Sequence, residues 1–209
     1  PKENIEFVAA FAEGLLLKHY QYEEVFTDKK RKLTKIQNLS LIIQDKKIGN
    51  ALKKQLDEII TTTEAVHAVR DMVNAPSNKM SPSLLAKKAQ EIAKKSRHLT
   101  CKVYGETRLK KMKMGCLIGV GQGAQEETKF IVLEHKYKSK NKKPIVLVGK
   151  GICFDAGGIN IKMRELPEMK FDMAGAATIL GVFQILSKYK LPLHVIGLAP
   201  CAENMLGSK

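Results

Sequence analysis

The sequence has no tryptophan, and aromatic residues make up only 6% of its 209 residues. Base-stacking platforms for single-stranded nucleic acid need aromatic side chains among basic ones, so this composition does not favour one. The four cysteines form no C-x-x-C pair, which argues against a zinc knuckle or a small disulfide scaffold. No apolar run approaches the roughly 20 residues of a membrane helix, and no signal-peptide core follows the polar start. We therefore expect a cytoplasmic protein with reduced thiols and no membrane segment.

The sequence is strongly basic. Its formal net charge is +15, from 36 Lys and Arg against 21 Asp and Glu. Such a balance makes nucleic acid or another anion a candidate partner. The lysines gather in two runs, at residues 28–35 and 136–143, and both runs lie between apolar segments. We interpret them as solvated loops and keep anion binding through them as an alternative.

Helices and strands are predicted in mixed order along the chain. Apolar residues at helical spacing predict helices at 5–19, 46–73, 82–95 and about 174–188, with Ser81 as N-cap and Thr61–Thr63 as a weak point. Apolar runs predict strands at 39–43, 100–104, 115–120, 130–133, 145–149 and 193–199, and residues 21–27 are expected to be extended. This pattern predicts an α/β layered domain whose sheet is covered by helices on both faces.

Polar chemistry concentrates in residues 148–162. An apolar strand leads into a glycine-rich turn that carries Lys150, Asp155 and Lys162. Open α/β sheets bind ligands at the carboxyl ends of their strands, so these side chains are well placed for chemistry. The four glycines of the segment allow close backbone approach or positive φ.

Three kinds of site could use this segment. The sequence has no G-x-x-x-x-G-K-[ST], so a phosphate-binding P-loop is not supported. It has no G-x-S-x-G, and Cys153 has no evident histidine partner, which argues against a nucleophilic hydrolase. It also lacks H-E-x-x-H, so a metal site would be rich in carboxylates, with Asp155 and Asp172 as candidates. Taken alone, Asp172 could equally cap the helix that starts near residue 174.

Several segments, taken together, resemble the leucyl aminopeptidase (cytosol aminopeptidase) family of two-metal exopeptidases. They are residues 71–78, 114–123, 148–162, 169–177, 191–192 and 203–205, in the family's order. The resemblance implies a mixed, mostly parallel sheet with helices on both faces, forming the first half of the catalytic domain. It further implies that residues 1–45 are the tail of a smaller α/β N-terminal domain, 46–73 a connecting helix and 74–209 the truncated catalytic domain.

The resemblance also implies a role for each site residue. Lys150 matches a lysine that binds one metal through its unprotonated amine, and Asp155 matches the aspartate that bridges both metals. Asp172 matches a ligand of the same metal as Lys150, which also receives the α-amino group of the substrate. Lys162 matches the catalytic lysine that donates to the scissile carbonyl, and Met169 a residue lining the substrate side-chain pocket. The implied cofactors are two divalent cations (zinc, manganese or magnesium).

Two departures from the family pattern shape our expectations. The stretch between Lys162 and Asp172 is one residue shorter than usual. The family's Asn-Thr-Asp-Ala-Glu-Gly-Arg signature, which supplies two more carboxylate ligands and the arginine that holds a bicarbonate base, does not occur. We therefore expect an internal fragment that holds at most one weakly bound metal and hydrolyses nothing by itself. The whole enzyme would act on peptides with a Leu-type preference and assemble as a homo-hexamer. The alternative is a non-catalytic scaffold that binds nucleic acid through its lysine-rich loops.

Overall fold

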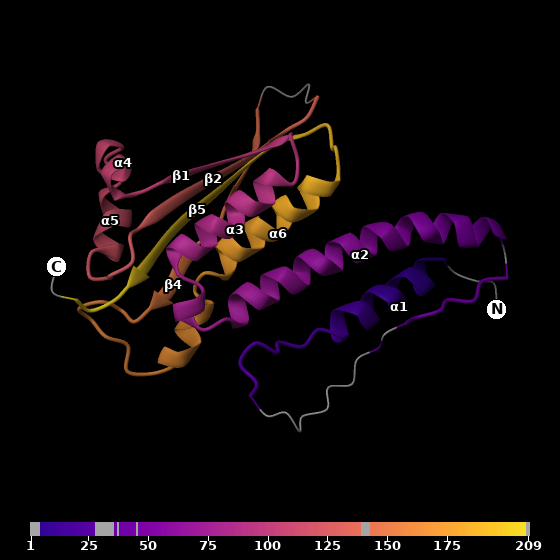
Figure 1. Ribbon diagram of the computed structural model, residues 1–209, viewed down its shortest axis with the longest axis horizontal. Coiled ribbons are helices and arrows are strands. Elements are labelled where there is room, and N and C mark those ends of the chain that lie inside the picture. The colour runs from indigo at the N-terminus through magenta and orange to yellow at the C-terminus, as the bar shows by residue number, and fades with distance from the viewer. Residues whose placement is uncertain (1–4, 28–35, 37, 45, 139–142, 208–209) are drawn as a thin grey trace. The chain divides into compact units, whose positions relative to one another are not determined.

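The computed structural model describes residues 5–27, 36, 38–44, 46–138 and 143–207. The chain divides into two compact units, Pro1–Ala68 and Val69–Lys209, with the boundary inside helix α2 (Figure 1). We describe each unit separately, as unit 1 and unit 2.

Unit 1 contains the two helices predicted for it. Helix α1 spans Ile5–Lys18 and buries Ala9 and Ala12. Helix α2 spans Lys46–Asn74 and runs without a break through Thr61–Thr63. The helices are connected by a hydrogen bond between His67 Nε2 and the Leu16 carbonyl oxygen, 3.1 Å apart.

The strand predicted at residues 39–43 is wrong. These residues are irregular, with Leu39 44% exposed and Ile42 90% exposed. A short apolar run becomes a strand only when a neighbouring strand pairs with it, and the described residues of unit 1 contain none. Residues 21–27 are also irregular, with a turn at 24–25, and are not a regular strand. The predicted basic loop at 28–35 lies outside the described residues.

Unit 2 is built on a mixed sheet, which confirms the α/β class. Its strands are β1 (Leu99–Tyr104), β2 (Lys129–Lys136), β3 (Ile145–Val148), β4 (Gly151–Asp155) and β5 (His194–Asn204). The order is β1-β2-β5-β3, and β4 pairs with the second half of β5. Within the part of the chain that the structure describes, β1–β2 and β2–β5 are antiparallel, whereas β3 and β4 run parallel to β5. The carboxyl ends of β4 and β5 therefore meet.

Helices α3 (Pro82–Lys94) and α6 (Ala174–Lys188) lie side by side against the sheet (Figure 1). Ser81 caps α3 as predicted, accepting a hydrogen bond from the Leu84 backbone N–H at 3.4 Å. Leu84 itself is 37% exposed. The core between the helices and the sheet is formed by fully buried side chains, among them Leu85, Ala89, Ile131, Leu133, Leu180 and Phe183.

Residues 166–188 are long and apolar enough to span a membrane by length and composition. In the structure this stretch holds two elements, the 3₁₀ helix η2 (Leu166–Phe171) and α6. Helix α6 buries apolar side chains from Ala176 to Leu186 within unit 2. Its hydropathy is therefore that of a core helix.

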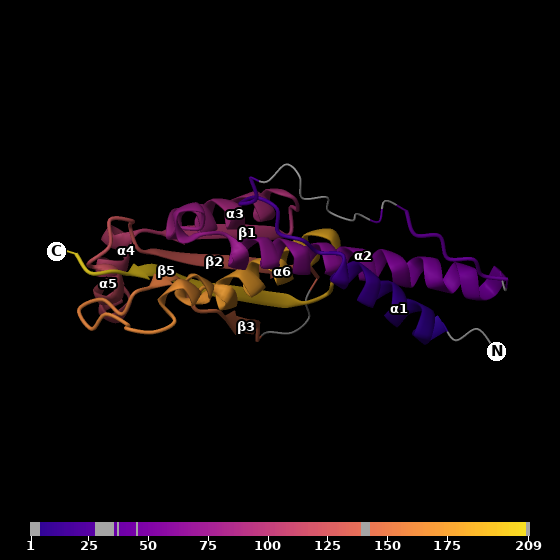
Figure 2. The same cartoon turned by 90° about the horizontal axis from the view of Figure 1, so that it is seen from below.

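Two further predictions in unit 2 need correction. Residues 115–120, predicted as a strand, form helix α5 (Gly115–Gly121), which follows α4 (Glu106–Lys111). Because β1 pairs directly with β2, no position between them is left for this segment. Figure 2 shows α4 and α5 at the end of the sheet where β5 ends. The second correction concerns Gly151–Asp155, which was predicted as part of a turn but forms strand β4.

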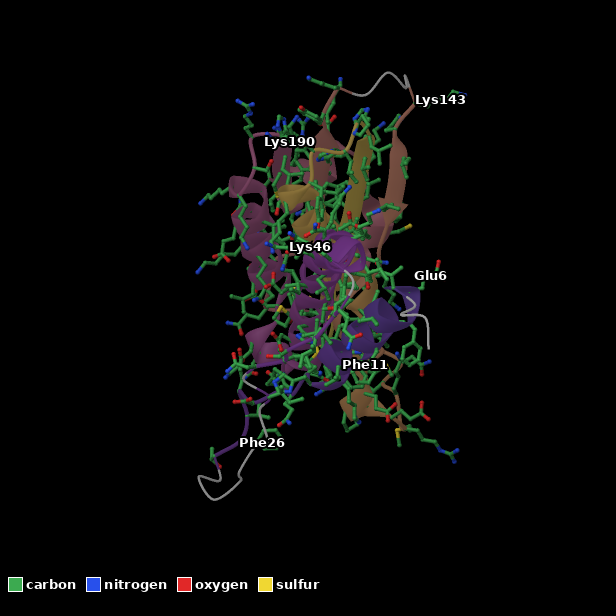
Figure 3. All side chains as sticks on the ribbon, turned by 90° about the vertical axis from the view of Figure 1, so that its right-hand side faces the viewer. Glu6, Phe11, Phe26, Lys46, Lys143 and Lys190 are labelled. Atoms are coloured by element: carbon green, nitrogen blue, oxygen red, sulfur yellow. The ribbon has the colours of Figure 1, made fainter. Side chains whose placement is uncertain are left out.

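The opposite end of the sheet carries basic residues. Lys143 precedes β3 and Lys190 precedes β5, and Figure 3 shows both at one end of unit 2. Residues 139–142 of the second basic run lie outside the described residues. The described members of that run are thus remote from the carboxyl ends of β4 and β5.

Candidate metal and catalytic site

Two lysine–aspartate pairs lie around strand β4. Lys150 precedes the strand, and its Nζ is 2.8 Å from Asp172 Oδ2. Asp155 ends the strand, and its Oδ2 accepts a hydrogen bond of 2.7 Å from Lys162 Nζ. The structure thus brings all four predicted charged site residues into direct contact, in two separate pairs.

Glycines allow the first pair to form. A Cβ added at Gly149 would overlap the carbonyl group of Gly175 and lie 2.8 Å from the Ala176 nitrogen. The backbone N–H of Ala176 donates to the Lys150 carbonyl oxygen at 2.8 Å, which fixes the start of α6 against the strand end. Asp172 lies just before α6, so this close approach brings its carboxylate to Lys150.

Asp172 does not cap helix α6. The N-cap residue is Met173, and no side chain makes a capping hydrogen bond there. The carboxylate is instead paired with Lys150 and is 26% exposed. The helix-capping interpretation of Asp172 is therefore wrong.

A tight turn after β4 positions Lys162. Gly157 and Gly158 have φ values of 92° and 62°, a region that favours glycine. The chain then returns, and the Lys162 N–H donates to the Ala156 carbonyl oxygen at 3.0 Å. Lys162 Nζ lies 2.9 Å from the sulfur of Met169, which η2 carries. Met169 and Lys162, both predicted site residues, are therefore in contact.

Asp155 is held as a carboxylate. Its side chain is 16% exposed, and this burial alone would raise its pKa. Hydrogen bonds from Lys162, Asn204 and the Gly157 N–H outweigh burial and hold the pKa below its usual range. The group is therefore ionised at neutral pH, as a metal ligand must be.

Asn204 was not predicted as a functional residue. Its side-chain amide donates to Asp155 Oδ1 at 2.7 Å, and the two residues face each other in the β4–β5 register. The sequence signal was its place in the Glu203-Asn204-Met205 stretch, which carried part of the family resemblance. The contact depends on a pairing across 49 residues of sequence, which local patterns do not predict.

The donor set fits a hard divalent cation. Two carboxylates and one amine are ligand types that such ions accept, and each aspartate is already paired with a positive charge. Within residues 5–207, gaps excepted, no three His, Cys, Asp or Glu side chains gather closely enough to hold a metal. Asp155 and Asp172 instead lie in two separate ion pairs, so a cation held by both would need Lys150 as a third ligand.

A cavity of about 400 Å³ adjoins the Asp155 side of the site. It is lined by α5 and the residues after it, by the turn at 157–160 and by the end of β5. Its wall includes Asn204, Gly157 and Gly158.

A second cavity, of about 850 Å³, contains two carboxylates. Glu203 and Glu126 both line it, together with Ser77, Asn78 and Phe154. Burial, and next the charge of Glu126, raise the pKa of Glu203. As pH rises past about 4.3, the usual pKa of an unfolded glutamate, the unfolded chain loses its proton first. The free energy of unfolding therefore decreases with rising pH until the pH exceeds the pKa of Glu203 in the folded protein. At pH 7 the charge of Glu203 is destabilising.

We therefore expect Glu203→Gln to stabilise the protein at pH 7. The gain in the free energy of unfolding should be about 0.2–1 kcal/mol, the range of partly exposed charge pairs, and should shrink at pH 4. Urea unfolding at the two pH values measures both quantities. An equal change at both would show that the charge of Glu203 is not responsible.

Comparisons with known proteins bear on the family and the fold. Residues 67–209 match the catalytic-domain model of the cytosol aminopeptidase family. A probable cytosol aminopeptidase of Bdellovibrio bacteriovorus is 38% identical over 208 residues, which cover 98% of this chain and 41% of that protein. One from Chlamydia trachomatis is 35% identical over 204 residues, covering 97% and 40%. The chain spans about two fifths of the length of these curated relatives.

A solved structure shares the fold. The bottromycin maturation enzyme BotP in complex with Mn matches with a TM-score of 0.83 and 30% sequence identity. The match covers 98% of this chain and 41% of that chain.

Proposed function

The chain belongs to the cytosol aminopeptidase family, and we propose that its site serves the metal-dependent removal of N-terminal residues from peptides. The observation that carries this proposal is the arrangement around β4. Lys150, Asp155, Lys162 and Asp172, the residues that match the family's motif, form two ion pairs around strand β4. The four groups come from two segments, 148–162 and 169–177, and each lysine faces an aspartate.

Asp155, Asp172 and Lys150 would hold the cation. Lys150 would have to bind as the unprotonated amine, since a metal ligand must be deprotonated. A bound divalent cation supplies polarisation of the scissile carbonyl and a water that is easily deprotonated. Asp172 would face the free α-amino group of the substrate, which accounts for cleavage at N-terminal residues.

Lys162 would stabilise the developing oxyanion. Its ammonium group is already held near the site, by Asp155 on one side and by the Met169 sulfur on the other. When a cation neutralises Asp155, Lys162 is free to donate its hydrogen bond to the carbonyl oxygen of the substrate. Met169, beside it, would contact the N-terminal side chain, for which we propose a Leu-type preference.

The cofactor and the cellular location are part of the same proposal. Zinc, manganese and magnesium all accept these donor types, and the presence of Mn in the BotP complex supports manganese. The family's name supports a cytoplasmic location. We also propose that the whole enzyme is a homo-hexamer with peptides as its substrates.

We expect the 209-residue chain by itself to hydrolyse nothing. The reason is the incomplete ligand set: the described residues supply two carboxylates and one amine. The test is release of ammonia from leucine amide with the purified chain in Mn²⁺ or Zn²⁺. Metal-dependent turnover that disappears in Asp155→Ala would contradict the expected inactivity while supporting the site. Turnover that survives Asp155→Ala would contradict the proposed site itself.

A further inference from the structure

Asn204 contacts Asp155 directly, although it lies outside the proposed ligand set and has no role assigned to it so far. Its Nδ2 is 2.7 Å from Asp155 Oδ1, and the Gly157 N–H reaches the same oxygen at 3.1 Å. The other oxygen, Oδ2, faces Lys162. Oδ1 is therefore fixed by the scaffold, whereas Oδ2 faces the side chain that a cation would displace.

Chemistry fixes the orientation of the Asn204 amide. An ionised carboxylate only accepts hydrogen bonds, so the NH₂ group of Asn204 must face Asp155. Asn204 Oδ1 then points to Gly158, where an added Cβ would lie 2.6 Å from it. Gly158, with its positive φ, thus leaves the space that the amide oxygen needs.

The backbone of Asn204 adds a second connection. Its carbonyl oxygen accepts a hydrogen bond of 2.9 Å from the Ala156 N–H, immediately after Asp155. Asp155 and Asn204 are also direct partners in the parallel β4–β5 ladder. Main chain and side chain of one residue thus hold the end of β4 and the carboxylate that it carries.

We propose that Asn204 is a positioning residue that orients Asp155 for cation binding. This inference rests on the proposed function, because it takes Asp155 as a cation ligand. Ligating carboxylates are commonly hydrogen-bonded by groups behind them, and loss of such a partner costs about 10–100-fold in metal affinity. Asn204 and the Gly157 N–H are the groups that fill this role for Asp155 in the described part of the chain.

The first test measures Mn²⁺ affinity by electron paramagnetic resonance of free Mn²⁺. Asn204→Leu keeps the size of the side chain but removes the donor, and Asn204→Ala removes both. We expect both to weaken Mn²⁺ binding about 10–100-fold. Asn160→Ala is the matched control, because Asn160 is an exposed asparagine in the adjacent turn. Affinities of both Asn204 variants within twofold of the wild type would overturn the proposal.

The second test needs no metal and no substitution at Asn204. In the metal-free wild type, the Asn204 side-chain amide protons should exchange slowly with water in NMR spectra, and Asp155→Ala should make them exchange fast. Fast exchange in the wild type would show that the contact does not form, which overturns the proposal. If these protons exchange slowly but the wild type does not bind Mn²⁺, the contact between Asn204 and Asp155 exists without a cation site. That result would contradict the proposed function.

Discussion

Replacing Asp155 by alanine is expected to weaken binding of Mn²⁺ about 100-fold or more. Asp155 is the carboxylate with the densest set of partners in the site, with Lys162 on Oδ2 and with Asn204 and the Gly157 N–H on Oδ1. Without Asp155, Asp172 is the one carboxylate left among the proposed ligands. The positive charge of Lys162 is then no longer compensated, and it repels the cation. Mn²⁺ titration of wild type and variant measures the loss.

Glu168→Ala is the matched control for this result. Glu168 is an exposed acid on η2, next to Met169, and it has no part in the proposed site. It should leave Mn²⁺ affinity within about twofold of the wild type. If Glu168→Ala and Asp155→Ala weaken binding equally, the cation is held by the general negative charge of this surface and not by Asp155.

Replacing Gly149 by alanine is expected to destabilise unit 2 by about 3 kcal/mol or more. The added methyl group would overlap the Gly175 carbonyl group, and both partners are backbone in a strand end and a helix start, which cannot turn aside as a side chain can. The same displacement would separate Lys150 from Asp172. Urea unfolding followed by circular dichroism measures the loss, and Mn²⁺ titration below the transition measures the effect on the site.

A second glycine in unit 2 gives the opposite expectation. Nothing lies within 4 Å of a Cβ added at Gly119, which is inside helix α5. Gly119→Ala should be neutral or stabilise by about 0.5–1 kcal/mol, because alanine favours helix more than glycine does. Equal destabilisation by the two substitutions would mean that the close approach of Gly149 to Gly175 is not the cause.

The sequence predicted the elements whose signal is local. Helix α3 follows from the Ser81 cap, Pro82 and its apolar spacing, and α2 and α6 from long apolar periodicity. Short apolar runs were ambiguous. Residues 115–120 and 39–43 are both short apolar runs predicted as strands, but neither pairs with a strand: the first is a helix and the second is irregular. Strand β4 was missed because its pairing with β5, and not its own residues, makes it a strand.

For the site too, the sequence identified residues but not the contacts that depend on distant parts of the chain. Residue types and the family resemblance identified Lys150, Asp155, Lys162, Met169 and Asp172, and the structure places each beside another member of the set. Which lysine faces which aspartate could not be predicted, because it depends on the turn at Gly157 and on the approach of α6. Asn204 was missed as a functional residue because its contact arises from the β5 register.

The central claim is that Lys150, Asp155 and Asp172 hold a divalent cation. Its most direct test is an anomalous difference map from crystals of the chain soaked in Zn²⁺. The account predicts a peak about 2.0–2.2 Å from a carboxylate oxygen of Asp155 or Asp172, with Lys150 or Lys162 moved from its aspartate. A map with no peak there, and with both lysine–aspartate pairs intact, would contradict the claim.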